Sequence, residues 1–156
     1  MTVRLDPHAA APRLMGEFFR SSNALIAGFD PKLAELVKMR ASQLNGCANC
    51  LNIHTYFARD LGESDQRIDL VATWREAPCY SERERAALGW TEALTRLSEG
   101  HAHIAAYEQL KAHFSEEEQV GLTMVINVIN GWNRIAVGFG GWADPAALKA
   151  QAAAGA

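Results

Sequence analysis

The segment Ser115–Ile129, SEEEQVGLTMVINVI, contains signals for both a strand and a helix. Residues 123–129 are rich in β-branched side chains, which favour strands. Ser115 followed by Glu118, however, matches the capping box that begins a helix, and the run has no evident partner strand. We therefore predict a buried helix at this position and an all-α fold.

The rest of the chain carries the same helical signals. Asp30-Pro31 and Asp144-Pro145 each combine an N-cap with a proline at the first helical position, and Ser81 with Glu84 forms a second capping box. Between these signals, apolar residues recur at spacings of three and four. The pattern predicts helices at residues 9–27, 32–44, 47–61, 64–74, 82–98, 103–113, 116–129, 131–139 and 144–152.

A weak internal repeat is suggested when Asn45-Gly46 is aligned with Asn130-Gly131. Both halves then read as an apolar helix, an Asn-Gly break and a second helix. Trp132 and Ile135 take the positions that cysteines occupy in the first copy. We interpret this as a degenerate helix–turn–helix repeat within a helical bundle.

Length and composition indicate a single domain over residues 1–156, with its core at about 20–140 and an alanine-rich C-terminal tail. The 156 residues are 49% hydrophobic and 21% charged, which is typical of globular proteins. A net charge of -3 without a basic stripe argues against nucleic acid as a partner. No signal peptide or membrane-spanning run is evident, and three cysteines do not make a disulfide scaffold. We expect a cytoplasmic protein with no membrane partner.

The residues that could carry chemistry gather in the sequence NGCANCLNIH, residues 45–54. If the chain is helical after Gly46, then Cys47, Cys50 and His54 fall within an arc of roughly 60°. A helix N-terminus favours the reactive thiolate, and His54, one turn beyond Cys50, can take its proton. An oxidised Cys50 can then condense with Cys47. The spacing therefore indicates redox chemistry.

A carboxylate that orients the histidine would complete this site. Glu35 lies twelve residues before Cys47, which is about 18 Å along one continuous helix. It can reach His54 only if the chain turns at Asn45-Gly46. The predicted helices 32–44 and 47–61 must then form an antiparallel or steeply crossed pair.

These residues resemble the core of the AhpD-like alkylhydroperoxidases, which belong to the carboxymuconolactone decarboxylase superfamily. The similarity extends in character over most of residues 20–140. The positions that carry it most specifically are Glu35, Lys38, Ser42, Gly46, Cys47, Cys50, His54 and Gly62.

The resemblance implies an all-helical fold assembled as trimers or hexamers. It also implies an antioxidant peroxidase in which Cys50 attacks the peroxide and Cys47 resolves the product. His54 would activate Cys50, with Glu35 as the relay carboxylate behind it. The substrate would be an organic hydroperoxide and the reductant a dithiol or a protein, with the Cys47–Cys50 disulfide in place of a cofactor or metal. Asn49 stands where the family's best-known member has histidine, so one relay component is absent.

Other interpretations of the same residues remain open. The two cysteines could be a buried pair that packs as small apolar residues. With His54 they could instead bind structural zinc, with a fourth ligand from Cys79, Glu35 or a distant histidine. A lyase acting on a lactone acid and a non-catalytic redox-sensing oligomer are the alternative functions. Lys38 and Arg40 can be explained as solvated side chains, and Cys79 as an incidental loop thiol.

Overall fold

The computed structural model describes residues 3–154, with side chains described through residue 150, so the extreme ends of the predicted domain 1–156 lie outside it. Within this range all regular structure is helical, which confirms the all-α prediction. The α-helices are α1 (Pro7–Ala10), α2 (Pro12–Ile26), α3 (Pro31–Leu44), α4 (Ala48–Asp60), α5 (Asp65–Leu70), α6 (Glu82–Thr95), α7 (Ala102–His113), α8 (Glu116–Phe139) and α9 (Pro145–Ala154). Two 3₁₀ turns, η1 (Val71–Thr73) and η2 (Leu97–Glu99), follow α5 and α6.

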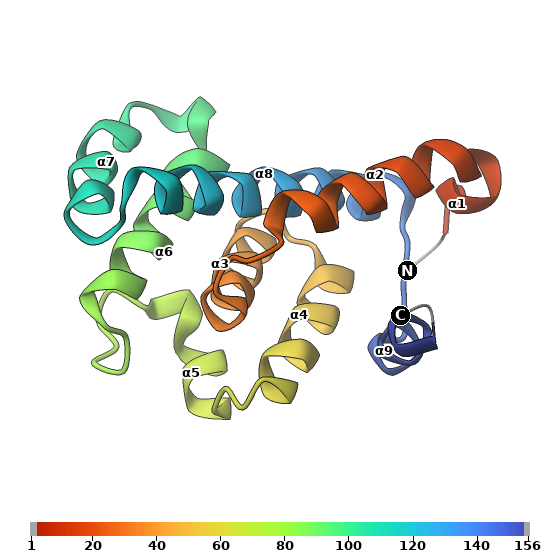
Figure 1. Cartoon of the computed structure of the whole chain (residues 1–156), viewed down its shortest axis with the longest axis horizontal. Helices are drawn as coiled ribbons and strands as arrows, with labels where there is room; N and C mark the ends of the chain where they lie inside the picture. Colours follow the sequence, from red (N-terminus) through yellow and green to blue (C-terminus); the bar gives the residue numbers. More distant parts are fainter. Residues whose placement is uncertain (1–2, 155–156) are drawn as a thin grey trace.

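Helix α3 lies at the centre of the molecule and packs against α4, α6 and α8 (Figure 1). Its apolar residues contribute to two clusters on different sides of the helix. Leu33 and Val37 pack with residues of α6, α7 and α8, whereas Leu36 and Met39 pack with α4, α6 and the segment after α5. Because α3 is covered on most sides, Glu35 and Ser42 on it are held away from bulk water.

Helix α8 is the long helix that crosses the molecule, and α2 lies along it (Figure 1). Its capping box, formed by Ser115 and Glu118, is present as predicted. The predicted break at Asn130-Gly131 is wrong, because residues 116–139 form one continuous helix. Consequently, the second half of the suggested repeat is not a helix–turn–helix unit.

Gly131 is explained by close packing rather than by a turn. A Cβ atom at this position would lie 2.9 Å from the ring Cζ of Phe18 on α2, so only glycine lets the two helices approach this closely. Asn130 keeps its own helix intact, since its side-chain amide donates to the carbonyl of Ile126 at 2.9 Å. Both residues are therefore accommodated inside a helix that their sequence predicts to end.

Other predicted boundaries differ by short interruptions. The predicted helix 9–27 is divided into α1 and α2 because Pro12, which cannot donate a backbone hydrogen bond, begins a new helix. The predicted helices 64–74 and 82–98 each finish in a 3₁₀ turn. The caps at Asp30 and Ser81 are present as predicted, and Ser64 caps α5.

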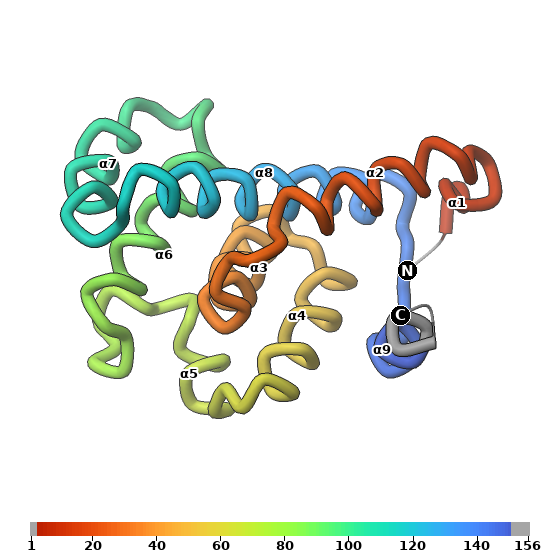
Figure 2. Tube along the Cα trace, viewed as in Figure 1, coloured from red at the N-terminus to blue at the C-terminus, as the bar shows by residue number. Residues whose placement is uncertain are grey.

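The two ends of the described chain run beside each other and close to α4. The amide of Arg4 donates to the carbonyl of Phe139 at 2.8 Å, at the end of α8. Beyond α8 the chain descends to α9, as Figure 2 shows, and Lys149 of α9 pairs with Asp60 of α4. No helix within residues 3–154 combines the length and apolar character needed to cross a bilayer.

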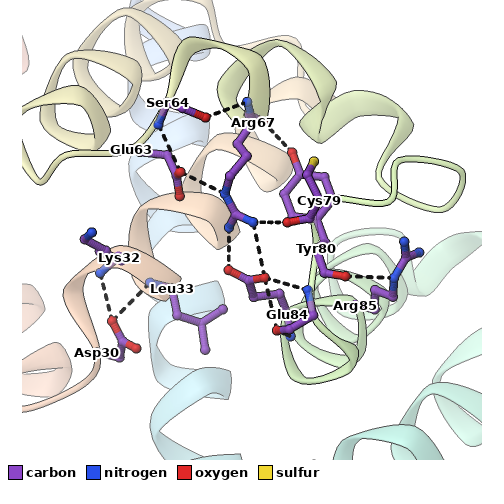
Figure 3. Close-up of polar contacts among 11 residues, drawn as sticks. Asp30, Lys32, Leu33, Glu63, Ser64, Arg67, Cys79, Tyr80, Glu84 and Arg85 are labelled. Atoms are coloured by element: carbon purple, nitrogen blue, oxygen red, sulfur yellow. Dashed lines mark hydrogen bonds and ion pairs between the residues drawn. The ribbon is translucent and has the colours of Figure 1, made fainter.

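The loop before α6 is held by a cluster of polar contacts around Arg67 (Figure 3). The Arg67 guanidinium pairs with Glu63 and Glu84 and donates to the carbonyl of Cys79. The Tyr80 hydroxyl in turn donates to the carbonyl of Arg67. Cys79 is not disulfide-bonded, and its side chain packs at the edge of the apolar cluster around Leu36. These contacts give the cluster and Cys79 a structural explanation.

Candidate active site

The site begins at the tight turn between α3 and α4. Asn45 is the C-cap of α3, and Gly46 adopts a left-handed conformation with φ +65°, which glycine tolerates better than any residue with a side chain. Cys47 then serves as the N-cap of α4, and its sulfur accepts a hydrogen bond from the amide of Cys50 at 3.3 Å. The chain turns within these three residues, so α3 and α4 pack against each other as the sequence requires.

The two cysteines lie in direct contact at the start of α4. They form a disulfide with a Cα–Cα distance of 5.4 Å, and they are only 1% and 4% exposed. Ala41, Ile129 and Ala136 surround them with apolar surface. The structure thus brings Cys47 and Cys50 together in a nearly dry environment.

Glu35 of α3 and His54 of α4 are also brought together. The Nδ1 atom of His54 lies 2.8 Å from Oε2 of Glu35. Because a carboxylate only accepts hydrogen bonds, Nδ1 carries the proton, and a neutral His54 has its lone pair on Nε2. His54 lies one helical turn beyond Cys50, as predicted, so its ring is held on the helix that carries the thiols.

Lys38 completes a buried chain of charges that sequence reasoning missed. Its Nζ atom lies 2.8 Å from Oε1 of Glu35, so the two carboxylate oxygens bind different partners. Only 13% of the Lys38 side chain and 9% of the Glu35 side chain are exposed. The interpretation of Lys38 as a solvated side chain is therefore wrong. Its position one turn after Glu35 on the same helix is the signal that could have identified it.

The charge on Glu35 is maintained despite its burial. Burial by itself raises the pKa of a carboxyl group, but the hydrogen bond and charge of His54 and the charge of Lys38 outweigh it. The pKa of Glu35 therefore lies below its ordinary value. An ionised Glu35 is what holds His54 in one orientation.

A network of asparagines anchors the Gly46 turn to α8. The Asn45 amide donates to Oδ1 of Asn130 at 2.9 Å and to Oδ1 of Asn133 at 2.8 Å. Asn133 is fully buried and donates to the hydroxyl of Ser42 at 3.0 Å, while the carbonyl of Ser42 accepts from the amide of Cys47. Asn133 is thus paired structurally, and Ser42 supports the turn through its hydroxyl and its carbonyl.

Asn49 and Asn52 attach the segment between α8 and α9 to the start of α4. Oδ1 of Asn49 accepts from the amide of Ala143 at 2.7 Å, and Nδ2 of Asn52 donates to the carbonyl of Ala143 at 3.2 Å. Asn49 therefore has a structural partner in the segment that follows α8.

A small cavity of about 150 Å³ lies beside this attachment and is lined by Cys47, but not by Cys50. Its other lining residues are small or apolar, except for Arg4 and Asn49: Gly46, Ala48, Ala136, Val137 and Gly141. A second cavity, of about 520 Å³, lies between α6 and α7 and has neither cysteine nor histidine in its lining. Of these two cavities, only the smaller one is lined by a cysteine of the disulfide.

Arg40 is paired rather than solvated, contrary to expectation. Its guanidinium binds the carboxylate of Glu92, which also accepts from the indole of Trp74 at 2.8 Å. Among the residues that the structure describes, no three His, Cys, Asp or Glu side chains are arranged to hold a metal ion. Of the predicted site residues, the structure pairs Cys47 with Cys50 at the start of α4, and it pairs Glu35 of α3 with His54 of α4.

The fold and site together define an AhpD-like helical protein. Residues 10–93 match the carboxymuconolactone decarboxylase family, and the chain belongs to that family. The structure of ATU0492 from Agrobacterium tumefaciens, a protein of unknown function proposed to be the antioxidant defence protein AhpD, matches with a TM-score of 0.88. The sequence identity is 42%, over 92% of this chain and 99% of that chain. The resemblance drawn from the sequence is confirmed.

Two further relatives place this likeness in context. The uncharacterized protein YdfG of Bacillus subtilis (strain 168) is 42% identical over 106 residues, which are 68% of this chain and 72% of YdfG. The debrominase Bmp8 in its apo form matches with a TM-score of 0.71 at 21% identity, over 86% of this chain and 72% of that chain. At this identity the second comparison shows a shared fold alone.

Proposed function

We propose that the protein is a thiol-dependent peroxidase that reduces organic hydroperoxides to alcohols. The observation that carries the proposal is the chain of contacts from Lys38 through Glu35 to His54, on the same helix as a buried dithiol. Catalysis of this kind needs a thiolate with a neighbouring base. The AhpD-like fold supports the same assignment.

The proposed reaction begins with the reduced protein. His54 takes the proton of Cys50, and the thiolate attacks the peroxide, which breaks the O–O bond. Cys50 becomes a sulfenic acid, and the departing alkoxide takes the proton from His54 and leaves as an alcohol. The thiol of Cys47 then attacks the sulfenic sulfur, releasing water and forming the disulfide.

The cycle closes when a dithiol or a protein thiol reduces this disulfide, so no further cofactor is needed. Glu35 acts in this scheme by holding His54 in position rather than by touching the peroxide. We place the protein in the cytoplasm, since a dithiol that is oxidised in each turnover needs a reducing compartment.

The test measures oxidation of the reduced protein by cumene hydroperoxide in a stopped-flow instrument. Cys50→Ser should abolish the fast reaction with peroxide, whereas Cys47→Ser should react once and accumulate a trappable sulfenic acid. A Cys50→Ser variant that reacts as fast as the wild-type protein would remove the assignment of Cys50. Because Cys47 rather than Cys50 lines the cavity, a sulfenic acid found in Cys50→Ser would reverse the two roles.

The role of His54 is tested separately through pH. The rate of disulfide formation after peroxide addition, followed by mass spectrometry, should depend on pH differently in His54→Ala than in the wild-type protein. Coincident profiles would show that His54 is not the activating base. A lactone-acid lyase, the alternative activity, would keep its rate after both thiols have been alkylated. A redox-sensing protein would form the disulfide reversibly without peroxide turnover.

A further inference from the structure

The segment Gly140–Ala143, which we call the C-terminal wall, links α8 to α9 and passes over the start of α4. Gly141 of this segment lines the cavity that exposes Cys47. The backbone of Ala143 is held by two side chains one turn apart on α4, its amide by Asn49 and its carbonyl by Asn52. The wall is thus fixed to the helix that carries both thiols.

The cavity behind this wall is small for a ligand site. Its volume of about 150 Å³ falls below the roughly 300–1,000 Å³ of pockets that enclose a drug-sized ligand, and is close to that of a cavity that holds benzene. Gly46, Ala48, Ala136 and Val137 give it surfaces of backbone and small apolar groups, and Arg4 and Asn49 complete the lining. A slender apolar group fits such a space, whereas a branched or peptidic thiol does not.

Of the two cysteines, only Cys47 lines this cavity. Both lie in the apolar cluster with Ala41 and Ile129. An external thiolate that enters here therefore meets Cys47 before Cys50. Attack at the sulfur of Cys47 leaves Cys50 as the departing thiolate, on the same helix as His54.

We propose that the C-terminal wall selects the reductant by size, admitting the slender end of an alkyl thiol that attacks Cys47. The proposal rests on the proposed function, in which the disulfide must be reduced in every cycle. The incoming thiolate forms a mixed disulfide with Cys47, and the S–S bond breaks with its electron pair on Cys50. Cys50 is then protonated by His54 or solvent, and a second thiol releases Cys47 and leaves as the oxidised reductant.

The clearest test variant is Asn52→Ala. Asn52 holds the wall but does not line the cavity, so its removal loosens the wall without reshaping the cavity itself. Asn49→Ala removes the other hydrogen bond and also changes the lining. Asn127→Ala, at an exposed asparagine on α8, is the matched control. None of these changes touches the proposed catalytic residues.

The measurement is the rate at which 2-mercaptoethanol or glutathione reduces the Cys47–Cys50 disulfide. Each rate is divided by that for an oxidised synthetic peptide covering residues 45–54, which corrects for the intrinsic reactivity of each thiol. The wild-type protein should favour 2-mercaptoethanol. Removing either hydrogen bond to Ala143 should raise the rate of reduction by glutathione by about five- to tenfold. The rate with 2-mercaptoethanol should be nearly unchanged.

Two accompanying measurements keep the outcome decisive. Hydrogen exchange of residues 140–148 should be faster in Asn49→Ala and Asn52→Ala than in the wild-type protein. It should be unchanged in Asn127→Ala. Acid quenching followed by mass spectrometry should find the first mercaptoethanol adduct on Cys47. The proposal would be overturned if hydrogen exchange in the wall did not become faster, or if it became faster while the ratio of the two reduction rates stayed the same. A first adduct on Cys50 would also overturn it. Because the disulfide is prepared with a chemical oxidant, these results do not depend on whether the protein reduces peroxides.

Discussion

At the scale of single residues, the site depends on a buried carboxylate that keeps its charge. Glu35 binds His54 through one oxygen and Lys38 through the other, each at 2.8 Å. Removing a partner from a buried ion pair is strongly destabilising because the remaining charge is uncompensated. Glu35 therefore contributes both to the stability of the α3–α4 pair and to the orientation of the histidine.

Replacing Glu35 by glutamine should change how stability depends on acidity. The pKa of Glu35 is lowered from its ordinary value of 4.5 in the folded protein. Its contribution is therefore complete above this value and is lost as the pH falls through the lower, folded-state pKa. At neutral pH, we expect Glu35→Gln to have an unfolding free energy about 1–3 kcal/mol lower than that of the wild-type protein. Between neutral and acid pH, the unfolding free energy of Glu35→Gln should then decrease less than that of the wild-type protein.

Urea unfolding at several pH values between neutral and acid measures this difference. Glu76→Gln, a change at an exposed glutamate outside the site, serves as the control and should reproduce the wild-type pH dependence. Parallel curves for Glu35→Gln and the wild-type protein would contradict the electrostatic explanation.

At the scale of secondary-structure elements, the turn between α3 and α4 places the thiols. Its conformation depends on Gly46, whose φ of +65° is unfavourable for residues with a side chain. Its position depends on Asn45 and Asn133, which join the turn to α8. A local backbone preference and a long-range polar contact thus act on the same few residues.

Gly46→Ala should destabilise the protein by about 1–2 kcal/mol through backbone strain alone. No atom lies within 4 Å of the position that a Cβ at residue 46 would take, so a steric clash does not contribute. Gly46→Asn should lose less, because asparagine adopts the left-handed conformation more readily than alanine does. Denaturant unfolding of the reduced proteins measures both differences.

Gly138→Ala is the matched control for this prediction. Gly138 lies inside α8, and a Cβ atom added there would also meet open space. Alanine there should leave the protein as stable or make it more stable by up to about 1 kcal/mol, because glycine is a poor helix former. Equal losses at residues 46 and 138 would show that the left-handed turn is not the cause.

At the scale of the whole molecule, α2 leaves an apolar flank uncovered. Helix α2 packs on α8 through residues such as Met15 and Phe18 (Figure 1). Leu14 and Leu25, three turns apart on one flank of the helix, remain 64% and 52% exposed. Exposed apolar surface of this kind is typical of a contact between proteins.

We propose that this flank forms part of the subunit contact of a homo-oligomer, a trimer or a hexamer as the family resemblance implies. The double change Leu14→Glu and Leu25→Glu should reduce the mass measured by size-exclusion chromatography with light scattering. Asn23→Glu, on the opposite side of α2, should leave the mass unchanged. A wild-type protein that is monomeric at all tested concentrations would contradict the prediction.

The helical content of the chain could be predicted from local signals. Capping boxes at Ser81 and Ser115, and prolines after Asp30 and Asp144, act within one turn of backbone, so the sequence reports them directly. The predicted break at Asn130-Gly131 is wrong because the same dipeptide that ends α3 lies inside α8. There, Phe18 from another helix requires a glycine, and no local rule contains that contact.

Local patterns in the chain were sufficient for the all-α class and for placing Cys47, Cys50 and His54 near one another, because these three residues follow the period of a single helix. Three other features required the packed molecule: Glu35 reaches His54, Lys38 shares the carboxylate, and Asn49 holds a distant segment. The contacts of Glu35 and Asn49 join segments that are distant in the chain, and the Lys38 contact, although one turn apart on α3, is buried only in the packed molecule. This packing of α3, α4 and the C-terminal wall is what the spacing of residues along the chain does not specify.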